Sequence, residues 1–234
     1  MQAMPTISCI ICAYNEEKTI GAMLSALLDH SSLDEVIIVN DGSTDNTDDI
    51  VRGFERVQLI SHPKNLGKSA ALASGIAAAR CDFIMLLDAD LIGLTQENIV
   101  QLTIPVLLGQ ADVTVSLRKN SLLVYRLIGL DFISGERVFA RALLRGKIAE
   151  IARLPRFGFE AYFNRLLIEQ KLRVSIVQWP NVMNNRKTKK MGFWRGTWAE
   201  FRMLADLFRF ASPWEIVAQN YHMLSLASLR GKRT

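Results

Sequence analysis

The sequence contains few cysteines and no long apolar run, and both absences limit the class of protein. Three cysteines in 234 residues cannot build a disulfide framework. Cys9 and Cys12 form a C-x-x-C, but they lie within the apolar run Ile7–Ala13, where residues three apart on a strand face opposite sides. We therefore expect buried thiols in a reducing compartment. No apolar run approaches the roughly 18 residues of a membrane span, and the first residues lack a basic leader, so we expect neither export nor membrane insertion.

The composition is that of a globular protein with a basic balance. Hydrophobic residues make up 50% of the chain and charged residues 22%, which suits one large domain or one domain with an extension. The formal net charge of +5 favours anionic partners such as phosphates, nucleotides, nucleic acid or an acidic membrane surface.

Segments typical of strands and of helices alternate in the first part of the chain. Short, continuously apolar runs predict strands, and apolar residues at helical spacing predict the helices between them. Asn15 is a candidate cap for the first helix. Because the strands are apolar throughout, both of their faces should be covered, as in an α/β fold with a mainly parallel central sheet flanked by helices. The predicted strands are 6–13, 35–40, 57–61 and 83–88, and a helix is predicted after each of the first three.

The pattern is less regular after Gly93. Pro105 is an objection to the first helix of this part, because proline disrupts helix interiors. The predicted elements are helices 96–108 and 160–170, strands 112–117 and 173–179, and a strand or helix start at 134–144.

Polar residues follow four of the predicted strands, at the point where each strand ends. In a parallel sheet the carboxyl ends of the strands lie at one edge, and ligands bind at that edge. The sequence therefore predicts a polar site there, and this convergence is stronger evidence than any single motif. The four polar segments are 14–17, 41–45, 65–68 and 88–90.

The apolar strand 83–88 leads into two carboxylates one residue apart, Asp88 and Asp90. Two like charges so close repel each other, and burial makes both harder to ionise, so we expect a positive group to compensate them. A divalent cation fits well, because Mg²⁺ or Mn²⁺ takes one or two carboxylates together with phosphate oxygens. Such a metal also neutralises a diphosphate leaving group.

Other interpretations of these motifs fit less well. A phosphatase-type D-x-D with Asp88 as nucleophile would need a later acidic pair, and only scattered acids follow. A calcium loop after the second strand would need glycine at Asn46 and glutamate at Arg52. A P-loop around Lys68 would need glycine at His62, and no G-x-G-x-x-G follows the first strand. The three histidines are isolated, which argues against a zinc site.

The first half of the chain carries four ordered motifs: CIICAYNEEKTIGAMLSALL, EVIIVNDGSTDNTDDIV, NLGKSAALASGIAAA and FIMLLDADL. In these motifs and their spacing the chain resembles family 2 glycosyltransferases of the GT-A fold. The resemblance implies a nucleotide-sugar-dependent, metal-dependent, inverting glycosyltransferase that transfers a hexose.

The resemblance also assigns roles to residues of the predicted edge. Asp90 would bind Mg²⁺ or Mn²⁺ together with Asp88, which would also contact the ribose or the sugar. Asn40 departs from the family, which usually has a second aspartate at this position. In the alternative interpretation, Asn40 and Asp41 only cap the following turn. By the resemblance, a UDP- or GDP-linked sugar would be bound by Ala13, Tyr14, Asn15, Glu16, Asp41, Ser43, Lys68, Asp88 and Ala89.

The second half most resembles polyprenyl-phosphate glycosyltransferases of the dolichyl-phosphate mannose synthase type. Arg118 and the segments ISGERVF, FGFEAYFNRLL and NNRKTKKMGFWRG carry this resemblance. It implies arginines that hold the acceptor phosphate and basic residues that close over the donor diphosphate, and guanidinium groups suit phosphate geometry. Solvated surface charges are the alternative interpretation. The residues implied are Arg118 and Arg137 for the acceptor phosphate, Ser134 and Gly135 for its loop, and Arg186 with Lys189 or Lys190 for the diphosphate.

The need for a general base depends on the acceptor. A lipid phosphate is already ionised near neutral pH, whereas a sugar hydroxyl must lose a proton. Of the available carboxylates, Glu136 and Glu160, we favour Glu160, because it begins a predicted helix whose dipole favours the charged form. It could equally serve only to stabilise that first turn. The candidate catalytic residues are therefore Asp88, Asp90 and Glu160, and two alternatives remain: transfer to a saccharide or small-molecule hydroxyl with Glu160 as base, and nucleotide binding without catalysis.

The C-terminal segment has the pattern of amphipathic helices. Aromatic residues share one helical stripe from Trp194 to Phe208, and arginines flank it, which suits an interfacial helix on an anionic membrane. Packing on its own domain or a homodimer interface is the alternative. We therefore expect a cytoplasmic protein on the inner face of the membrane. No nucleic-acid partner is expected, because no stacking aromatics interleave the basic residues of 186–190.

The expected boundaries are a GT-A domain over 1–190, with a nucleotide-sugar half 1–93 and an acceptor half 94–190, and an extension over 191–234.

Overall fold

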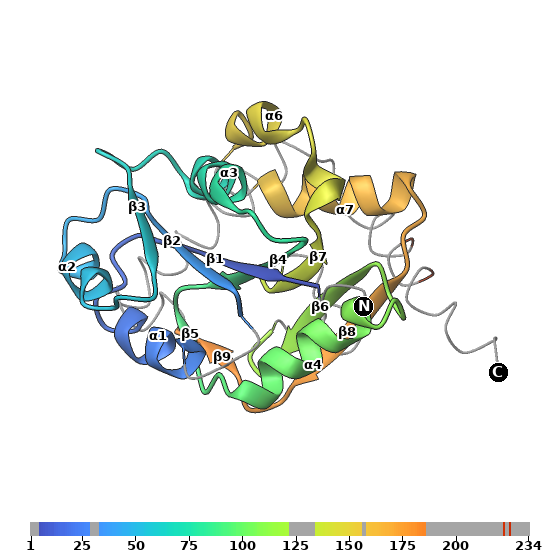
Figure 1. Cartoon of the computed structure of the whole chain (residues 1–234), viewed down its shortest axis with the longest axis horizontal. Coiled ribbons are helices and arrows are strands. Elements are labelled where there is room, and N and C mark those ends of the chain that lie inside the picture. Colours follow the sequence, from blue (N-terminus) through green and yellow to red (C-terminus); the bar gives the residue numbers. More distant parts are fainter. Residues whose placement is uncertain are drawn as a thin grey trace.

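The computed structural model describes residues 5–28, 33–121, 134–155 and 158–185, together with His222 and Ser225. Within these ranges strands and helices alternate, and one central sheet carries helices on both faces (Figure 1). Continuously apolar strands require such cover, because neither face can be left to water. The predicted fold class, a mainly parallel sheet flanked by helices, is confirmed. The strands of this sheet are β1 (Ile7–Ala13), β2 (Glu35–Asn40), β3 (Gln58–Ser61), β4 (Phe83–Asp88), β6 (Val113–Arg118), β7 (Arg137–Ala140) and β8 (Val174–Trp179).

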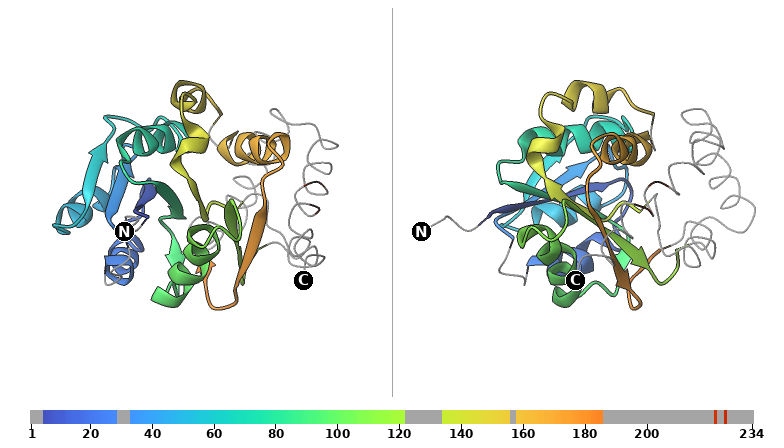
Figure 2. Two further views of the ribbon diagram at one scale, coloured as in Figure 1. Left: turned by 45° about the vertical axis from the view of Figure 1, so that its right-hand side comes forward. Right: turned by 90° about the vertical axis from the view of Figure 1, so that its right-hand side faces the viewer.

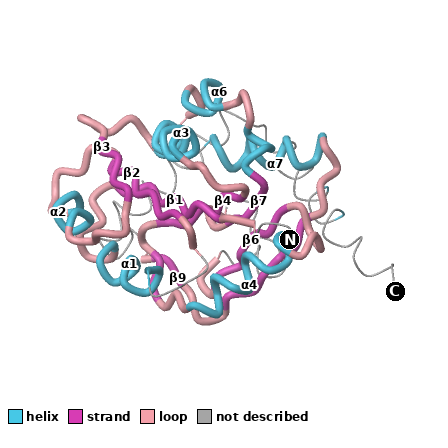
Figure 3. Tube along the Cα trace, in the orientation of Figure 1, coloured by secondary structure: helices cyan, strands magenta, loops and turns pink. Residues whose placement is uncertain are grey.

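The helices form two layers, one on each face of the sheet. The views of Figure 2 and the tube of Figure 3 show the same separation, with strands between helices. One face is covered by α1 (Ile20–Leu28), α2 (Thr47–Arg52) and α4 (Gln96–Leu107), and the other by α3 (Lys68–Ala78), α6 (Ile148–Ala152) and α7 (Gly158–Glu169).

The order of the strands, β3-β2-β1-β4-β7-β6-β8, contains one reversal that matters for the site. All neighbouring strands are parallel except that β7 runs antiparallel to both β4 and β6. The chain therefore enters β7 at the edge where β4 and β6 end. The register places Arg137 opposite Leu86 and Val115, so the residues just before β7 lie beside the ends of those two strands.

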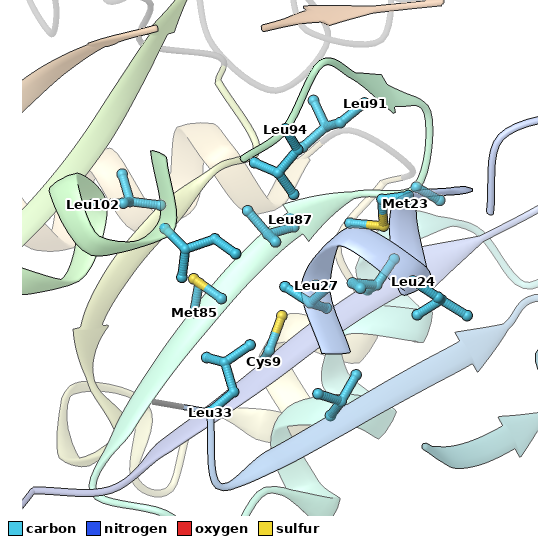
Figure 4. Packing of buried hydrophobic residues seen from close by; sticks show 14 of the residues in the cluster. Cys9, Met23, Leu24, Leu27, Leu33, Met85, Leu87, Leu91, Leu94 and Leu102 are labelled. Atoms are coloured by element: carbon cyan, nitrogen blue, oxygen red, sulfur yellow. The ribbon is translucent and has the colours of Figure 1, made fainter. Parts of the chain in front are cut away.

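Two apolar clusters, one on each face of the sheet, form the core. Cys9 belongs to the cluster under α1, where Figure 4 shows it beside Leu27 and Met85. Cys12 packs against the opposite cluster. Both thiols are free, and burial raises the pKa of each well above its ordinary value, so neither is a reactive thiolate. The C-x-x-C therefore consists of two strand cysteines, as predicted, with Cys9 buried and Cys12 partly buried.

Asn15 does not cap the first helix, so that prediction was wrong. The helix α1 begins five residues later, at Ile20, and Asn15 adopts a left-handed backbone conformation with φ of 56°. Asparagine tolerates this conformation better than most residues. Its side-chain oxygen accepts a hydrogen bond from the backbone N–H of Thr44 at 2.8 Å, in the turn after β2. Asn15 therefore links the turn after β1 to the turn after β2.

The second half contains elements that the sequence pattern did not predict. A small antiparallel sheet pairs β5 (Leu91–Ile92) with β9 (Met183–Asn184) directly after the carboxylate pair. The ambiguous segment 134–144 contains the strand β7 followed by a short 3₁₀ helix, Arg141–Leu144. Pro105 lies near the end of α4, which it does not interrupt.

None of the described helices is long and apolar enough to cross a membrane. The expected C-terminal amphipathic extension, 191–234, lies outside the described residues apart from His222 and Ser225.

The close packing of α3 on the sheet generates a prediction about stability. A Cβ on Gly75 would overlap the Cγ2 of Ile10 and lie 3.3 Å from the Cγ2 of Val39. We expect Gly75→Ala to lower the free energy of unfolding by about 1–3 kcal/mol through overpacking. The control is Gly21→Ala, whose Cβ would meet only the Cγ2 of Ile50 at 3.4 Å. Urea unfolding should show the control unchanged or more stable by up to about 1 kcal/mol, and equal stability of the two variants would contradict the packing.

Candidate active site

The turns after β1 and β2 are held together by hydrogen bonds at the predicted edge. The backbone N–H of Asn15 donates to the Oγ of Ser43 at 3.0 Å. The backbone N–H of Glu16 donates to the Oγ1 of Thr47 at 2.8 Å. Together with the Asn15–Thr44 contact, these bonds fix the two turns against each other. The structure thus brings Asn15, Glu16 and Ser43 into one place, as the sequence predicted.

Asp41 connects this edge to the start of α3. Its buried carboxylate accepts hydrogen bonds from the backbone N–H groups of Leu66 and Gly67, at 2.9 and 2.8 Å. The Nδ1 of His62 lies 2.8 Å from the same carboxylate, and its Nε2 lies 3.0 Å from the Oγ of Ser74 on α3. Asp41 therefore holds the turn after β3, not the turn that follows it in sequence. His62 was missed, because an isolated histidine carries no signal in one sequence.

Lys68, the first residue of α3, joins two of the predicted carboxylates. Its Nζ lies 2.9 Å from the Oδ1 of Asp88 and 2.8 Å from the Oε1 of Glu160. Glu160 lies in the first turn of α7 and is only 4% exposed. Asp41 fixes the turn that precedes Lys68, and the contacts with Asp88 and Glu160 place its ammonium group.

Asp88 is compensated by two positive side chains of the protein itself. Lys68 contacts its Oδ1, and NH1 of Arg118, at the end of β6, lies 3.3 Å from its Oδ2. Burial opposes the ionisation of Asp88, but the charges of Lys68 and Arg118 outweigh it and hold the pKa of this carboxyl well below its usual range. The sequence predicted that a metal would compensate both aspartates, and for Asp88 much of the compensation comes from these two residues.

Asp90 is in the opposite situation. Burial, followed by the negative charges of Asp88 and Glu16, raises its pKa to about 7, and Arg118 offsets this only in part. Among the described residues, no hydrogen bond or ion pair to the Asp90 carboxylate is present, while its backbone oxygen accepts from the N–H of Asn185 at 3.0 Å. When Asp90 ionises, its charge is therefore only partly compensated by Arg118.

This arrangement fits a divalent cation bound together with a diphosphate. The described part of the chain has no group of three or more side chains that could form a metal cage alone. A hard cation such as Mg²⁺ does not need one, because it takes one or two carboxylates and fills its remaining positions with phosphate oxygens and water. Asp90, whose charge has no partner among the described residues, is the carboxylate suited to hold such an ion, with Asp88 next to it.

Glu136 is a buried carboxylate close to Asp88. Glu136, just before β7, is 0% exposed and accepts hydrogen bonds from NH1 of Arg118 at 2.7 Å, from Ser116 at 2.7 Å and from Ser134 at 2.6 Å. Burial raises the pKa of Glu136, and the charge of Arg118 opposes that shift. Because β7 runs antiparallel to β4 and β6, it starts where those two strands end. The residues just before β7, Ser134 and Glu136, therefore lie beside Arg118 and Asp88.

Gly135 is in close contact with the Asp88 carboxylate. A Cβ at this position would overlap the Oδ1 of Asp88 and lie 2.9 Å from its Oδ2. The absence of a side chain therefore allows the start of β7 to approach the carboxylate. The resemblance placed Gly135 and Ser134 in an acceptor loop, and both lie at this edge beside Asp88 and Glu136.

Arg137 does not face the site, in contrast to the prediction that it would hold an acceptor phosphate. Its side chain is 1% exposed, its Nε donates to the backbone oxygen of Ser134 at 2.8 Å, and its NH1 donates to Asn164 at 2.6 Å. The guanidinium also lies over the ring of Phe163, 5.5 Å from the centroid. In β7 it points to the face opposite its neighbour Glu136, and there it supports the loop of Ser134 and the helix α7.

The remaining predicted residues lie at the edge or outside the described part of the chain. Tyr14 is 42% exposed at the end of β1, where an aromatic face is accessible to a ligand. Glu16 is buried, and its carboxylate accepts from the Oγ1 of Thr19 at 3.0 Å. Ala13, at the end of β1, and Ala89, between the two aspartates, are both buried. Arg186, Lys189 and Lys190 lie outside the described residues.

Asn40 has a structural reason to differ from the aspartate that the resemblance expects. Its amide nitrogen donates to the Oδ1 of Asp48 at 2.8 Å, and its side-chain oxygen accepts from the backbone N–H of Ser43 at 3.0 Å. A carboxylate could accept from Ser43 but would face Asp48 with a second negative charge. The hydrogen bonds of Asp48 with Ser61 and Asn40, and the nearby Arg52, hold its pKa below the ordinary value.

Comparison with known proteins shows which family this edge of the sheet resembles. Residues 8–96 match the model described as glycosyl transferase family 2. Asp41, Lys68, Asp88 and Asp90 lie within the matched residues. Arg118, Glu136 and Glu160 lie beyond them, in the part that the family model does not cover.

The similar curated proteins differ in what their names say they act on. Over 94 residues the chain is 38% identical to a dolichyl-phosphate beta-glucosyltransferase of Trichomonas vaginalis, a match to 35% of this chain and 28% of that protein. Over 93 residues it is 38% identical to the poly-beta-1,6-N-acetyl-D-glucosamine synthase of Staphylococcus epidermidis, with 38% and 23% covered. The chain therefore spans less than a third of the length of these relatives.

A likeness to solved structures extends over most of the chain. The crystal structure of glucosyl-3-phosphoglycerate synthase from Mycobacterium tuberculosis, in complex with Mn²⁺, uridine-diphosphate and glucosyl-3-phosphoglycerate, matches with a TM-score of 0.66. The match covers 88% of this chain and 80% of that chain, at 24% sequence identity. It confirms the predicted GT-A arrangement of the fold, including the second half that the family model leaves out.

The Asn40–Asp48 hydrogen bond generates a prediction that can be tested by exchanging the two residues. We expect Asn40→Asp to lower the free energy of unfolding by about 1–3 kcal/mol at pH 7, because it puts two carboxylates against each other in a buried place. This loss of stability should become smaller toward pH 4, where one of the two carboxylates takes up a proton. The exchange variant Asn40→Asp/Asp48→Asn restores one donor and one acceptor and should recover most of the stability in urea unfolding. A single variant as stable as the wild type would contradict the contact.

The raised pKa of Asp90 predicts a pH dependence of stability without metal. An acid whose pKa is higher in the folded than in the unfolded protein favours folding when protonated, so its ionisation lowers stability as the pH rises from about 4 to 8. In EDTA-treated protein, Asp90→Asn should therefore be more stable than the wild type by about 2 kcal/mol at pH 8, after allowance for partial exposure, and no more stable at pH 4. Thermal unfolding across this range measures the difference, and a pH-independent difference would exclude the titration of Asp90.

Proposed function

We propose that the chain is a metal-dependent, inverting glycosyltransferase that transfers a hexose from a nucleotide sugar to a polyprenyl phosphate at the inner surface of the cytoplasmic membrane. The observation that carries this proposal is the unequal compensation of Asp88 and Asp90. One carboxylate is already paired with the protein's own cations, and its neighbour in the same family 2 domain has no charged partner among the described residues at the ligand-binding edge of the sheet.

The donor would bind across the turns that follow β1, β2 and β3. Tyr14 offers an accessible aromatic face, and the turns joined by Asn15 and Ser43 offer a fixed wall for the nucleoside. Mg²⁺ or Mn²⁺ at Asp90, with Asp88 beside it, would stabilise the charge of the departing nucleoside diphosphate. The glucosyl-3-phosphoglycerate synthase of similar fold was crystallised with Mn²⁺ and uridine-diphosphate, which supports a metal and a UDP-linked donor.

The acceptor side of the site favours an anionic nucleophile. Arg118 places a guanidinium group at the end of β6, within 3.3 Å of Asp88. Glu160 is nearly buried and lies 2.8 Å from the ammonium group of Lys68, so it is poorly placed to take a proton from a sugar hydroxyl. A phosphate oxygen needs no such base. The match to dolichyl-phosphate beta-glucosyltransferases supports this acceptor class.

The proposed step is a single displacement at the anomeric carbon. An oxygen of the lipid phosphate forms a bond to that carbon while the bond from the carbon to the diphosphate oxygen breaks, and the configuration inverts. No proton has to be removed from the nucleophile, and the nucleoside diphosphate leaves as an anion. Arg118 would orient the incoming phosphate, and Lys68 would keep Asp88 and Glu160 in place between the two reactants. Arg186 and Lys190 are proposed to close over the diphosphate, and the C-terminal segment to rest on the anionic membrane surface.

Transfer to a hydroxyl is the second candidate. The match to a poly-beta-1,6-N-acetyl-D-glucosamine synthase favours it, because that name describes a saccharide product. In this case Glu160 would act as the base and would have to separate from Lys68 when the acceptor binds.

Release of nucleoside diphosphate tests the proposal. The protein is mixed with Mn²⁺, UDP- and GDP-linked hexoses, and undecaprenyl or dolichyl phosphate in detergent. We expect release that depends on the lipid phosphate and falls at least about 100-fold in Asp90→Ala, since a catalytic metal contributes several kcal/mol. The control is Asp112→Ala, an aspartate paired with Arg173 at 2.8 Å at the opposite end of β6, which should keep near wild-type activity.

Two further outcomes separate the alternatives. Activity on lipid phosphate that survives Glu160→Gln supports the anionic acceptor. Turnover with saccharides that requires Glu160, without turnover of lipid phosphate, would replace it by the hydroxyl acceptor. Nucleotide binding without any turnover would overturn the catalytic proposal.

A further inference from the structure

Glu136 is a buried carboxylate for which the proposed reaction provides no role. It is fully enclosed, and its side chain accepts three hydrogen bonds from the protein: from NH1 of Arg118, Ser116 and Ser134. Because it is completely buried, it cannot contact a ligand directly. Yet a buried carboxylate is costly unless it is paired, so its presence beside the site needs a reason.

The position of Glu136 is fixed by the sheet. The backbone N–H of Ser116 donates to the backbone oxygen of Glu136 at 3.1 Å, which continues the pairing of β6 with β7. The hydroxyl groups of Ser116 and Ser134 both donate to its Oε2. One carboxylate oxygen is thus tied to the two strands, and the other, Oε1, is directed to Arg118.

Arg118 lies between two carboxylates and is held by the nearer one. Its NH1 is 2.7 Å from the Oε1 of Glu136 but 3.3 Å from the Oδ2 of Asp88. Charge-assisted hydrogen bonds of guanidinium groups are typically about 2.7–2.9 Å long, so the first contact is a full bond and the second is loose. Without the charge of Glu136, the same NH1 group would be drawn to Asp88, the other carboxylate that it already contacts.

We propose that Glu136 is a positioning residue, which holds the guanidinium of Arg118 back from Asp88 so that Arg118 keeps its place for an anionic acceptor. This inference rests on the proposed function, because it gives Arg118 the acceptor as its ligand. It goes further by naming the group that sets the position of Arg118.

The variant Glu136→Gln tests this role with little change of shape. Glutamine can still accept from Arg118 and donate to the two serine hydroxyls, which can turn to accept, but it no longer carries a charge. Arg118 should then shift toward Asp88. We expect the KM for the lipid phosphate to rise about tenfold or more, while the KM for the nucleotide sugar stays within about twofold.

The chain offers a matched control in Glu35, at the opposite edge of the sheet. Its nearly buried carboxylate also accepts from a serine and an arginine, Ser8 at 2.6 Å and Arg80 at 3.0 Å. Glu35→Gln also removes a charge that is paired with an arginine, and it should leave the KM for the acceptor unchanged. If both variants change activity equally, or if Glu136→Gln alters donor and acceptor KM alike, the role of Glu136 is only structural.

A double-mutant cycle asks whether Glu136 acts through Arg118. In an Arg118→Gln background, Glu136→Gln should cause no further rise in the KM for the acceptor, because the group it positions is gone. Additive effects in the cycle would overturn the proposal. The double variant also removes both buried charges, so it should fold even if Arg118→Gln alone, with the charge of Glu136 left uncompensated, does not.

A crystal structure of Glu136→Gln provides a readout that does not depend on turnover. The distance from NH1 of Arg118 to the Oδ2 of Asp88 should shorten from 3.3 Å to about 2.8 Å. An unmoved guanidinium would overturn the positioning role even if the enzyme is active. If the wild type does not use lipid phosphate, the proposed acceptor fails, but this distance still decides whether Glu136 holds Arg118 away from Asp88.

Discussion

Two carboxylates at the end of one apolar strand create the electrostatic problem around which this structure is arranged. Burial disfavours the charged form of both, and each makes ionisation of the other harder. The protein compensates them unequally. Lys68 and Arg118 take one oxygen each of Asp88, whereas Asp90 receives no such partner from the described residues. An arrangement that stabilised both charges would leave no place for a cation, and one that stabilised neither would not keep Asp88 ionised. The unequal compensation makes Asp90 the carboxylate suited to a cation at this edge of the sheet.

The two cations reach Asp88 from opposite halves of the chain, and long-range hydrogen bonds set both positions. In the first half, Asp41 holds the turn that precedes Lys68. In the second half, Glu136 holds Arg118, and the reversed strand β7 brings Glu136 to the edge where β6 ends. Each cation also contacts a second carboxylate: Lys68 contacts Glu160, and Arg118 contacts Glu136. Ion pairs of this kind keep long, flexible side chains in one geometry, as the proposed transfer would require.

Sequence patterns predicted the parts of this structure that depend on local properties. Apolar runs and helical spacing identified most strands and helices, and the polar residues after the strands identified the edge, because both follow from periods of a few residues. The direction of β7, the pairing of β5 with β9 and the burial of Arg137 depend on contacts between distant segments, and no local period records them. The same holds for His62 and Glu136, whose partners lie on other strands or helices. Asn15 shows a further limit, since a cap residue and a left-handed turn residue have the same local signal.

The division between the two halves also explains why the likeness to family 2 glycosyl transferases is easier to recognise than an acceptor. The matched residues 8–96 contain Asp88, Asp90, Lys68 and the turns after β1 and β2, and relatives whose names give different products each match about a third of this chain. Arg118, Glu136 and Glu160 come after residue 96 and surround the other side of Asp88. Because Lys68 and Arg118 contact the same carboxylate, a change near Arg118 alters the charge around Asp88 and so reaches the residues of the first half. Under the proposed function, acceptor specificity can therefore diverge only among arrangements that leave Asp88 ionised and Asp90 open to a metal.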